Sequence, residues 1–435
     1  MGGLLQLDAE LERLPAGPLL VGFSGGLDSS VLLHALAHSP VARARGLRAI
    51  HVDHGLHRDS AHWATHCQAV CTQLGVPLQV VRVEVVPRGE GPEGAARNAR
   101  WQAFRVHAGA AHILVLAHHR DDQAETVLLR LLRGAGPTGL SAMRPWCVRE
   151  DGLRVWRPLL ALPRECLRDY ARQHALDWLD DPGNELPDYD RNLLRLEVMP
   201  RLRRRWPQLD ATLAQVAGRM ADAVELEHEA ARRLLARAAT PCANILLLPP
   251  LQAATRAQRW AALRLWLRTH GVSDAGAARL SRIERELIDA GIDADPCLPL
   301  GGRVLRRHRQ TLHLLAAGAD QPLRYRLEWD GLAPLTLPDG SVLALDPPPP
   351  QALALLVASR QGGERLRVHS PGPRRELRLL FQELGVPTWL RQRWPVLWQD
   401  GEPVAFADLV VAARFRRRLQ ALGCSLRFTP VDAPR

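Results

Sequence analysis

The sequence contains no lysine, so all 57 of its lysine-or-arginine positions are arginines. A Walker A phosphate loop places a lysine on the phosphates of its nucleotide, and a Schiff-base enzyme uses a lysine amine as its nucleophile. Both classes are therefore excluded. The accompanying richness in alanine, arginine and proline is also what a genome-wide bias in composition produces.

Cysteine is scarce as well. The seven cysteines are scattered, and only Cys67 and Cys71 lie close together, one helical turn apart, which predicts buried free thiols. The first residues, MGGLLQLDAELERL, lack the basic and apolar pattern of a signal peptide, and no apolar run reaches the roughly 18 residues of a membrane span. The sequence predicts a soluble, cytoplasmic protein without a membrane partner.

The length and the net charge of the chain indicate how many domains it forms and what kind of partner it binds. A chain of 435 residues exceeds one ordinary hydrophobic core, which predicts two or three domains. Arginines outnumber the 46 acidic residues and give a formal net charge of +11. A basic excess of this kind favours a polyanionic partner such as nucleic acid.

The first part of the chain alternates short apolar runs with amphipathic ones. Four strand and helix pairs in series predict a doubly wound parallel α/β sheet of the Rossmann-like kind. The expected strands are residues 18–23, 46–54, 77–85 and 111–119. Ligands in such sheets bind beyond the carboxyl ends of the strands, where 24–29, 53–55 and 118–122 would meet.

The later parts of the chain differ from the first part in their residue pattern. Residues 206–318 show alanine, leucine and arginine at helical spacing, which predicts a helical domain. Residues 319–435 contain short alternating runs and many turn residues, which predict a small α+β domain. We therefore expect a catalytic nucleotide-binding domain over 1–205, followed by these two domains.

One stretch, VGFSGGLDSSVLL at residues 21–33, carries the most specific chemistry. A strand end followed by Ser24, Gly25 and Gly26 and then a helix start lets backbone N–H groups converge on phosphate oxygens. Asp28 would repel those phosphates unless a divalent cation such as Mg²⁺ lay between them. The alternative is a tight turn in which Asp28 or Ser29 caps the helix.

The hexapeptide of residues 24–29 resembles the signature of the PP-loop ATP pyrophosphatase superfamily, whose members bind ATP and cleave it between the α and β phosphates. This resemblance implies ATP as a substrate and favours nucleotide binding over a simple cap. The implied ATP-binding residues are Ser24, Gly25, Gly26, Leu27, Asp28, Ser29, His54 and His118.

A second acidic group lies at the start of the helix in AHHRDDQAETVLLRLLRG. Asp121 and Asp122 open this helix, and one of them could complete the oxygen shell of the cation with Asp28; Glu125 follows one turn later. The alternative for both aspartates is complementing the helix dipole. Arg97 and Arg100 share one face of the preceding helix and could clamp phosphates, although such a pair is also typical of a solvated surface.

Longer motifs narrow the resemblance to the tRNA(Ile)-lysidine synthetase family. They are ordered and span nearly the whole chain: HVDHGL at 51–56, AARNARWQAF at 95–104, AHHRDDQAET at 117–126, RGAGPTGLSAM at 133–143, RPLL at 157–160, LDDPGN at 179–184, YDRNLLRLEVMPRL at 189–202 and LFQELGVPTWLR at 380–391. The family often has lysine before the last motif, where this chain has arginine in SPGPRREL.

The family resemblance implies a reaction on the wobble cytidine of an isoleucine tRNA with a CAU anticodon. ATP adenylates the C2 oxygen, and the ε-amine of free lysine then displaces AMP to give lysidine. The implied catalytic residues are Asp28, Asp122, Arg97, Arg100 and Glu125, with Asp28 and Asp122 holding Mg²⁺. Contact with tRNA or lysine is implied for Asp181, Asn184, Arg191, Asn192 and Arg195.

Some choices stay open at the level of sequence. The proton acceptor for the lysine amine could be Glu125, Asp180, Asp181 or Asp188. Arginine-rich segments at 202–207 and 412–423 could follow an RNA backbone or form exposed helix faces. The chain could act as a monomer or a homodimer.

Three other functions fit the sequence less well. A tRNA thiolase on the same domain would carry a catalytic cysteine pair, and an amidotransferase-type synthetase would carry a glutaminase segment; the sequence has neither. A non-catalytic, ATP-sensing RNA-binding protein has less use for Asp28 and Asp122 near a triphosphate.

Overall fold

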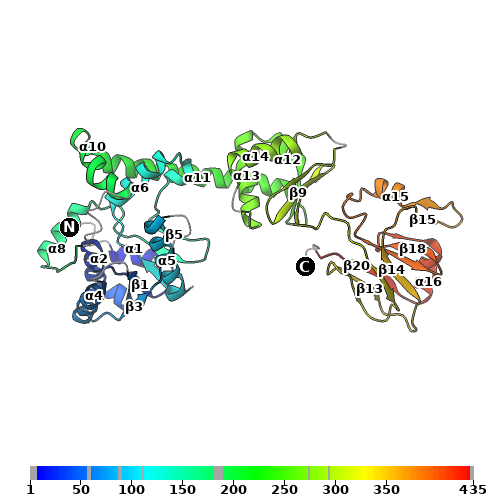
Figure 1. Cartoon of the computed structure of the whole chain (residues 1–435), viewed down its shortest axis with the longest axis horizontal. Coiled ribbons are helices and arrows are strands. Elements are labelled where there is room, and N and C mark those ends of the chain that lie inside the picture. The colour runs from blue at the N-terminus through cyan, green and yellow to red at the C-terminus, as the bar shows by residue number, and fades with distance from the viewer. Residues whose placement is uncertain are drawn as a thin grey trace. The chain divides into compact units, whose positions relative to one another are not determined.

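The computed structural model forms two compact units, Met1–Leu226 and Glu227–Arg435, which are considered separately (Figure 1). The structure describes residues 7–55, 60–86, 91–109, 111–180, 190–272, 275–291 and 294–431.

The first unit is built on a six-stranded sheet of order β3-β2-β1-β4-β6-β5. Its first five strands are parallel, which confirms the predicted doubly wound fold, and β5 is an antiparallel edge strand. The strands are β1 (Leu19–Gly22), β2 (Leu47–Asp53), β3 (Leu78–Arg82), β4 (Ile113–Val115), β5 (Trp146–Val148) and β6 (Arg154–Trp156).

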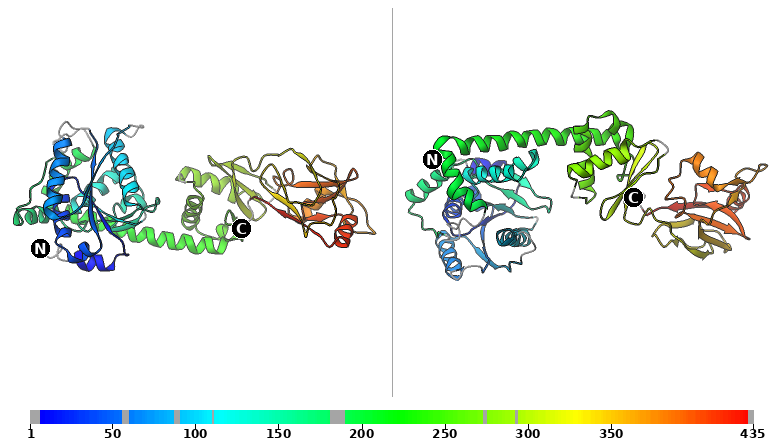
Figure 2. Two further views of the ribbon diagram at one scale, coloured as in Figure 1. Left: turned by 90° about the horizontal axis from the view of Figure 1, so that it is seen from below. Right: turned by 45° about the horizontal axis from the view of Figure 1, so that its top comes forward.

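Helices cover both faces of this sheet, as Figure 2 (left) shows for the blue and cyan helices on either side of the strands. Leu19 and Val21 pack in one core and the intervening Leu20 in another, because side chains alternate along a strand. The first core includes α1 (Leu7–Arg13), α2 (Leu27–Ala37), α3 (Pro40–Ala44), α4 (Ser60–Leu74) and α8 (Arg164–Gln173). The second contains α5 (Gly91–Ala108).

Further helices complete the first unit and lead out of it. The carboxyl end of β4 runs into α6, which brings the start of α6 to the same sheet edge as the start of α2. These helices are α6 (Arg120–Leu132), α7 (Pro137–Leu140), α9 (Asp190–Leu193), the π-helix η2 (Leu194–Val198), α10 (Met199–Arg205) and α11 (Leu209–Ala238).

The middle of the chain is helical, as predicted, and it also contains an antiparallel sheet of order β7-β10-β9-β8. Its helices are α12 (Leu248–Ala253), α13 (Arg256–Thr269), α14 (Ala277–Ile283) and η3 (Glu284–Ile288). Its strands are β7 (Ile245–Leu247), β8 (Cys297–Pro299), β9 (Arg303–His308) and β10 (Thr311–Ala316). One core joins the helices to this sheet through residues such as Leu263 and Leu305.

The last part is the predicted small α+β domain, with sheets of order β11-β14-β17-β18-β19, β12-β13-β20 and β15-β16. Its elements are β11 (Arg326–Trp329), β12 (Leu335–Thr336), β13 (Val342–Asp346), β14 (Leu355–Ser359), β15 (Arg365–Leu366), β16 (Arg375–Glu376), α15 (Leu377–Leu384), β17 (Pro395–Gln399), β18 (Glu402–Phe406), β19 (Val410–Val411), α16 (Ala413–Ala421) and β20 (Ser425–Thr429).

The structure also bears on several other expectations from the sequence. Cys67 and Cys71 are fully buried free thiols, as predicted. None of the described helices is long and apolar enough to cross a membrane. The expected domain boundaries after residues 205 and 318 stay predictions, and the division between the two compact units falls inside α11.

Candidate functional site

The glycine turn lies between β1 and α2, at the carboxyl edge of the sheet. Gly25 has a φ of +83°, which favours glycine, and Gly26 precedes the first residue of α2. The Ser29 hydroxyl accepts the N–H of Ser24 at 3.2 Å and donates to the carbonyl of Gly26 at 3.0 Å. The two serine side chains therefore hold the loop in shape.

Gly26 is not required by its own conformation. Its φ of −81° suits any residue, and a Cβ atom added there would meet only the carbonyl oxygen of Leu179 and the Ser24 hydroxyl, both at 3.6 Å. In the described structure, no side chain caps the amino end of α2. The uncapped N–H groups of a helix start attract anions.

Asp28 lies next to two cationic or polar side chains of other elements. Its carboxylate is 3.4 Å from Nε of Arg164, the first residue of α8, and 3.6 Å from Nε2 of His119. His119 caps α6: the N–H of Asp122 donates to its Nδ1, which leaves Nε2 to face the Asp28 and Asp122 carboxylates. The starts of α2, α6 and α8 thus meet around His119.

The pKa of His119 reflects this position. Burial would lower it, but the hydrogen bond to Asp28 and the negative charges of Asp122, Asp28 and Asp121 raise it above its ordinary value. Three carboxylates therefore surround the His119 ring at this edge.

Asp122 and Glu125 form a buried ion network with two arginines from far along the chain. Arg191 and Arg195 both donate to Oδ1 of Asp122 at 3.0 Å. They also donate to Glu125, whose side chain is 3% exposed, at 2.8–3.2 Å. Burial alone would raise the pKa of Asp122, yet His119 and the arginines hold it well below its usual range.

The described residues contain no group of three or more histidine, cysteine, aspartate or glutamate side chains placed to hold a metal ion. Magnesium bound to a nucleotide keeps waters and phosphate oxygens as ligands and needs only one or two carboxylates. The residues present fit that pattern. Asp28 has the longer, weaker contacts, whereas both oxygens of Asp122 already accept hydrogen bonds.

Two predicted histidines line the same sheet edge. His54 follows β2 and His118 follows β4, and Nδ1 of each is buried without a partner in the described structure. Burial lowers the pKa of His118 to about 3, with Arg157, Arg191 and Arg100 adding to the effect. Burial and the charge of Arg100 lower the pKa of His54. Both rings are therefore neutral at physiological pH.

The remaining predicted residues are less tightly assembled. Arg97 and Arg100 lie on the exposed side of α5, and Arg100 acts electrostatically on His54 and His118. Asn192 is half-buried on α9. Asp180 is exposed. The predicted positions Asp181, Asn184 and Asp188 lie outside the described residues.

The structure adds residues that the sequence interpretation did not assign. Arg164 contacts Asp28, and Arg203 contacts Asp121 at 3.5 Å and Asp210 at 2.7 Å. The sequence interpretation assigned no role to Arg164, because this residue lies in none of the motifs. Its one local feature is that it begins a helix directly after Pro163. His119 stood inside the motif AHHRDDQAET, so its position could have suggested a role.

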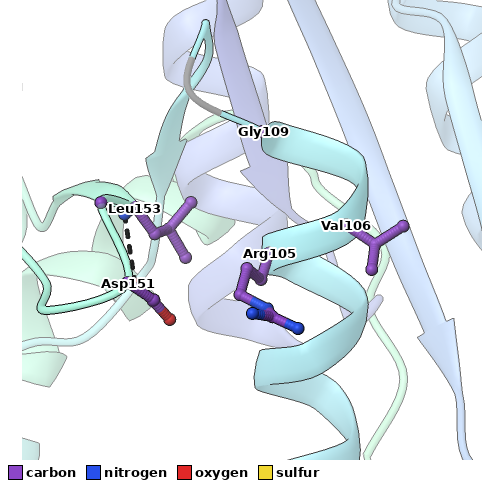
Figure 3. Close-up of a pocket in the computed structure, with 6 residues that line it drawn as sticks. Arg105, Val106, Gly109, Asp151 and Leu153 are labelled. Atoms are coloured by element: carbon purple, nitrogen blue, oxygen red, sulfur yellow. Dashed lines mark hydrogen bonds between the residues drawn. The ribbon is translucent and has the colours of Figure 1, made fainter. Parts of the chain in front are cut away.

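A shallow hollow of about 280 Å³ lies elsewhere on the first unit (Figure 3). It is formed by the last turn of α5, with Arg105, and by the turn between β5 and β6, where the N–H of Leu153 donates to Asp151. This turn precedes β6, so the hollow lies at the opposite end of that strand from the glycine turn edge. It is not part of the candidate site.

Three family models match the chain in order. They are a PP-loop domain over residues 5–202, a TilS substrate binding domain over 246–313 and a TilS substrate C-terminal domain over 355–428. The first covers the glycine turn and the carboxylate network.

Curated relatives match almost from end to end. A tRNA(Ile)-lysidine synthase of Xanthomonas axonopodis pv. citri is 44% identical over 97% of this chain and 97% of its own length. Proteins with the same name from Alkalilimnicola ehrlichii and Xylella fastidiosa are 42% and 40% identical, over 93% and 95% of this chain and 92% and 95% of their own lengths.

Proposed function

Because this chain belongs to the tRNA(Ile)-lysidine synthase family of ATP-dependent ligases, we propose that it joins free L-lysine to the wobble cytidine of an isoleucine tRNA with a CAU anticodon. ATP transfers its AMP group to the C2 oxygen of the cytidine and releases pyrophosphate. The ε-nitrogen of lysine then attacks C2, and the C2 oxygen leaves with AMP. The product is lysidine.

The observation that supports this function best is that, in the described structure, no side chain caps the amino end of α2. Among the described residues, no side chain caps the backbone N–H groups after Gly26, and none would clash with a Cβ atom there. Phosphate oxygens placed against these N–H groups would gain hydrogen bonds and the favourable end of the helix dipole. The same groups would stabilise charge that develops on the α phosphate.

We assign the magnesium ion to Asp28, with Asp122 as its partner. A bound Mg²⁺ ion would supply positive charge that neutralises the polyphosphate during transfer. Arg164 lies beside Asp28 and provides a fixed cation at the start of α8. In a chain without lysine, arginine is the side chain left to make such charge-assisted contacts with phosphate.

The lysine amine has to lose a proton before it attacks. Asp122 and Glu125 are suited to hold an ammonium group, since both carboxylates are buried at this edge and both pair with cationic side chains. In the structure, these two carboxylates already pair with Arg191 and Arg195. An incoming ammonium group would therefore exchange with an arginine contact rather than meet a free carboxylate.

A thiolase reaction is disfavoured by the state of the cysteines near the turn. Cys67 lies under Gly25, and burial raises the pKa of both Cys67 and Cys71 to about 12. Thiols in that state are protonated and inaccessible, so they are poor nucleophiles. A function as an RNA-binding protein without turnover remains the second candidate.

Mass spectrometry of the tRNA tests the proposal. After incubation with ATP and lysine, we expect the wobble cytidine of the CAU-anticodon isoleucine tRNA to gain the mass of one lysine less one water. Incubation without lysine serves as the control. An unchanged tRNA that nevertheless binds the protein would favour the non-catalytic alternative.

A further inference from the structure

Arg157 follows the last residue of β6 and is almost completely buried, with 6% of its surface exposed. Its Nη1 donates to the carbonyl of Arg144 at 2.9 Å and to the sulfur of Cys147 at 3.5 Å. Among the described residues, no acceptor faces its Nε or Nη2, and no carboxylate lies within 4 Å. Within the described part of the chain, it is therefore a buried cation without a counterion.

A second buried arginine shows what a purely structural solution looks like in this chain. Arg307, 3% exposed, also has no carboxylate partner in the described structure, but it donates to the carbonyls of Leu287, Ile288, Ala290 and Arg309. Three of these carbonyls lie at the end of η3, where the helix dipole is negative. Arg157 has one carbonyl, and burial of an uncompensated charge is costly.

The position of Arg157 in the fold suggests which anion could pair with it. β6 pairs with β4, whose carboxyl end carries His118, and the charge of Arg157 helps to lower the pKa of that histidine. His118 brings a second unpartnered nitrogen, Nδ1, to the same edge. Next along the chain, α6 carries Asp122 and Glu125, the carboxylates to which we assigned the ammonium group.

We propose that Arg157 binds the α-carboxylate of the substrate lysine and so selects an amino acid over a simple amine. This inference rests on the proposed function and assigns one recognition contact within it. Lysine carries a carboxylate at one end and the ε-ammonium group at the other, and this edge of the sheet offers carboxylates on α6 and, after β6, a guanidinium without a carboxylate partner among the described residues. Arginine can donate two parallel N–H groups to a carboxylate, and Nε of Arg157 has no hydrogen-bond partner among the described residues.

The phosphates of ATP are a less suitable partner for Arg157. They belong at the glycine turn after β1, and β4 separates β1 from β6 in the sheet. Neighbouring strands are about 4.8 Å apart, so β6 is roughly 10 Å from β1. Arg164, which contacts Asp28, is the arginine that faces the turn.

The test compares Arg157→Gln with the wild-type enzyme in lysidine formation. We expect the KM for lysine to rise about 10- to 100-fold, the usual range for losing a hydrogen-bonded charge contact. AMP transfer to tRNA in the absence of lysine should stay unchanged. Inhibition by 6-aminohexanoate, which keeps the carboxylate, should weaken by the same factor, while inhibition by cadaverine, which lacks it, should not change.

Arg130→Gln is the matched control, because Arg130 is a partly buried arginine of the same unit that donates only to the carbonyls of Gly139 and Ala142. It should leave the KM for lysine unchanged. Arg157→Lys keeps the buried charge and should show the same pattern more weakly, which covers a Gln variant that does not fold.

Equal losses for 6-aminohexanoate and cadaverine, or a loss of AMP transfer without lysine, would overturn the assignment and point to a phosphate contact or a structural role. Failure of the proposed function itself would appear differently, as a wild-type enzyme that forms no lysidine at all.

Discussion

At the scale of single residues, the two glycines of the turn between β1 and α2 are needed for different reasons. Gly25 combines a φ of +83° with a close approach, since a Cβ atom there would lie 3.0 Å from the sulfur of Cys67. Gly26 has an ordinary backbone and room for a methyl group. Gly25 thus serves the fold, whereas the proposed function assigns Gly26 to the ligand.

This difference predicts the behaviour of Gly26→Ala. The methyl group should leave the fold intact, with a melting temperature within about 4 °C of the wild type, because only the small cost of alanine at a helix start is expected. It would occupy the space beside the phosphate-binding N–H groups, so we expect the KM for ATP to rise at least about tenfold. Thermal unfolding and steady-state kinetics measure the two effects.

Gly302→Ala is a control for the substitution itself, since a Cβ atom at Gly302 meets nothing within 4 Å and lies in the second unit. It should alter neither quantity. An unchanged KM for ATP in Gly26→Ala would contradict the assignment of the phosphate site.

The sequence identified the types of site residues better than their partners. The glycine turn, Asp122 and Glu125 were predicted from local motifs, because spacing within one turn or helix is readable along the chain. The pairing of Glu125 with Arg195, 70 residues later, depends on how α9 and η2 pack against α6. Local periodicity contains no information about such a contact, nor about the burial of Arg157.

At the scale of elements, the buried ion network joins α6 to η2. Removing one partner of a buried pair leaves an uncompensated charge, which usually costs about 3 kcal/mol or more. We therefore expect Arg195→Met to lower the free energy of unfolding of the first unit by about that amount, because Glu125 would stay buried. Urea unfolding measures this.

The exposed pair of Arg133 and Asp190 is the matched control, because it joins the end of α6 to the start of α9 with side chains that are 63% and 66% exposed. Arg133→Met should change stability by less than about 1 kcal/mol. Similar losses in both variants would show that burial does not set the strength of the network.

A buried histidine gives the second unit a pH dependence. His313 on β10 is 9% exposed and contacts Trp389, and burial lowers its pKa to about 4. The unfolded chain, with a histidine pKa near 6.5, binds the extra proton first. Stability should therefore fall by about 1.4 kcal/mol per pH unit as the pH drops from 6.5 toward 4.

Urea unfolding of the wild type and His313→Gln at several pH values checks this. In His313→Gln, the loss of stability with falling pH should be smaller by the equivalent of one bound proton, and the remaining pH dependence should be unchanged. Identical slopes would show that His313 is not held neutral.

The elements themselves were predicted unevenly. The four apolar runs of the first unit became β1 to β4, since each is bounded by turns and followed by an amphipathic helix. β5 and β6 have only three residues each, too few to show a period. β9 reads RVLRRH, in which arginines obscure the alternation, and its buried face appears only once β8 and β10 pair with it.

At the scale of the whole molecule, the net charge of +11 predicts that RNA binding depends strongly on salt. Arg414, Arg417 and Arg418 on α16 are exposed. Replacing all three with glutamine should reduce the slope of log affinity against log salt by about 2 to 3, if each meets one phosphate. Filter binding of the isoleucine tRNA between low and moderate salt measures the slope.

Arg233 and Arg282 provide a comparison, because each is an exposed arginine already paired with a glutamate one helical turn away. Glutamine at both positions should leave the slope nearly unchanged. An equal effect from the two sets would mean that net charge, rather than a site on α16, governs binding.

In the proposed reaction, the glycine turn presents ATP for AMP transfer to a tRNA base, and lysine completes the reaction. The most direct measurement follows radiolabelled α-phosphate with tRNA and ATP, first without and then with lysine. We predict that label accumulates on the isoleucine tRNA with the CAU anticodon and is released as AMP only when lysine is added. Formation of ADP, or release of AMP that is independent of both tRNA and lysine, would contradict this reaction.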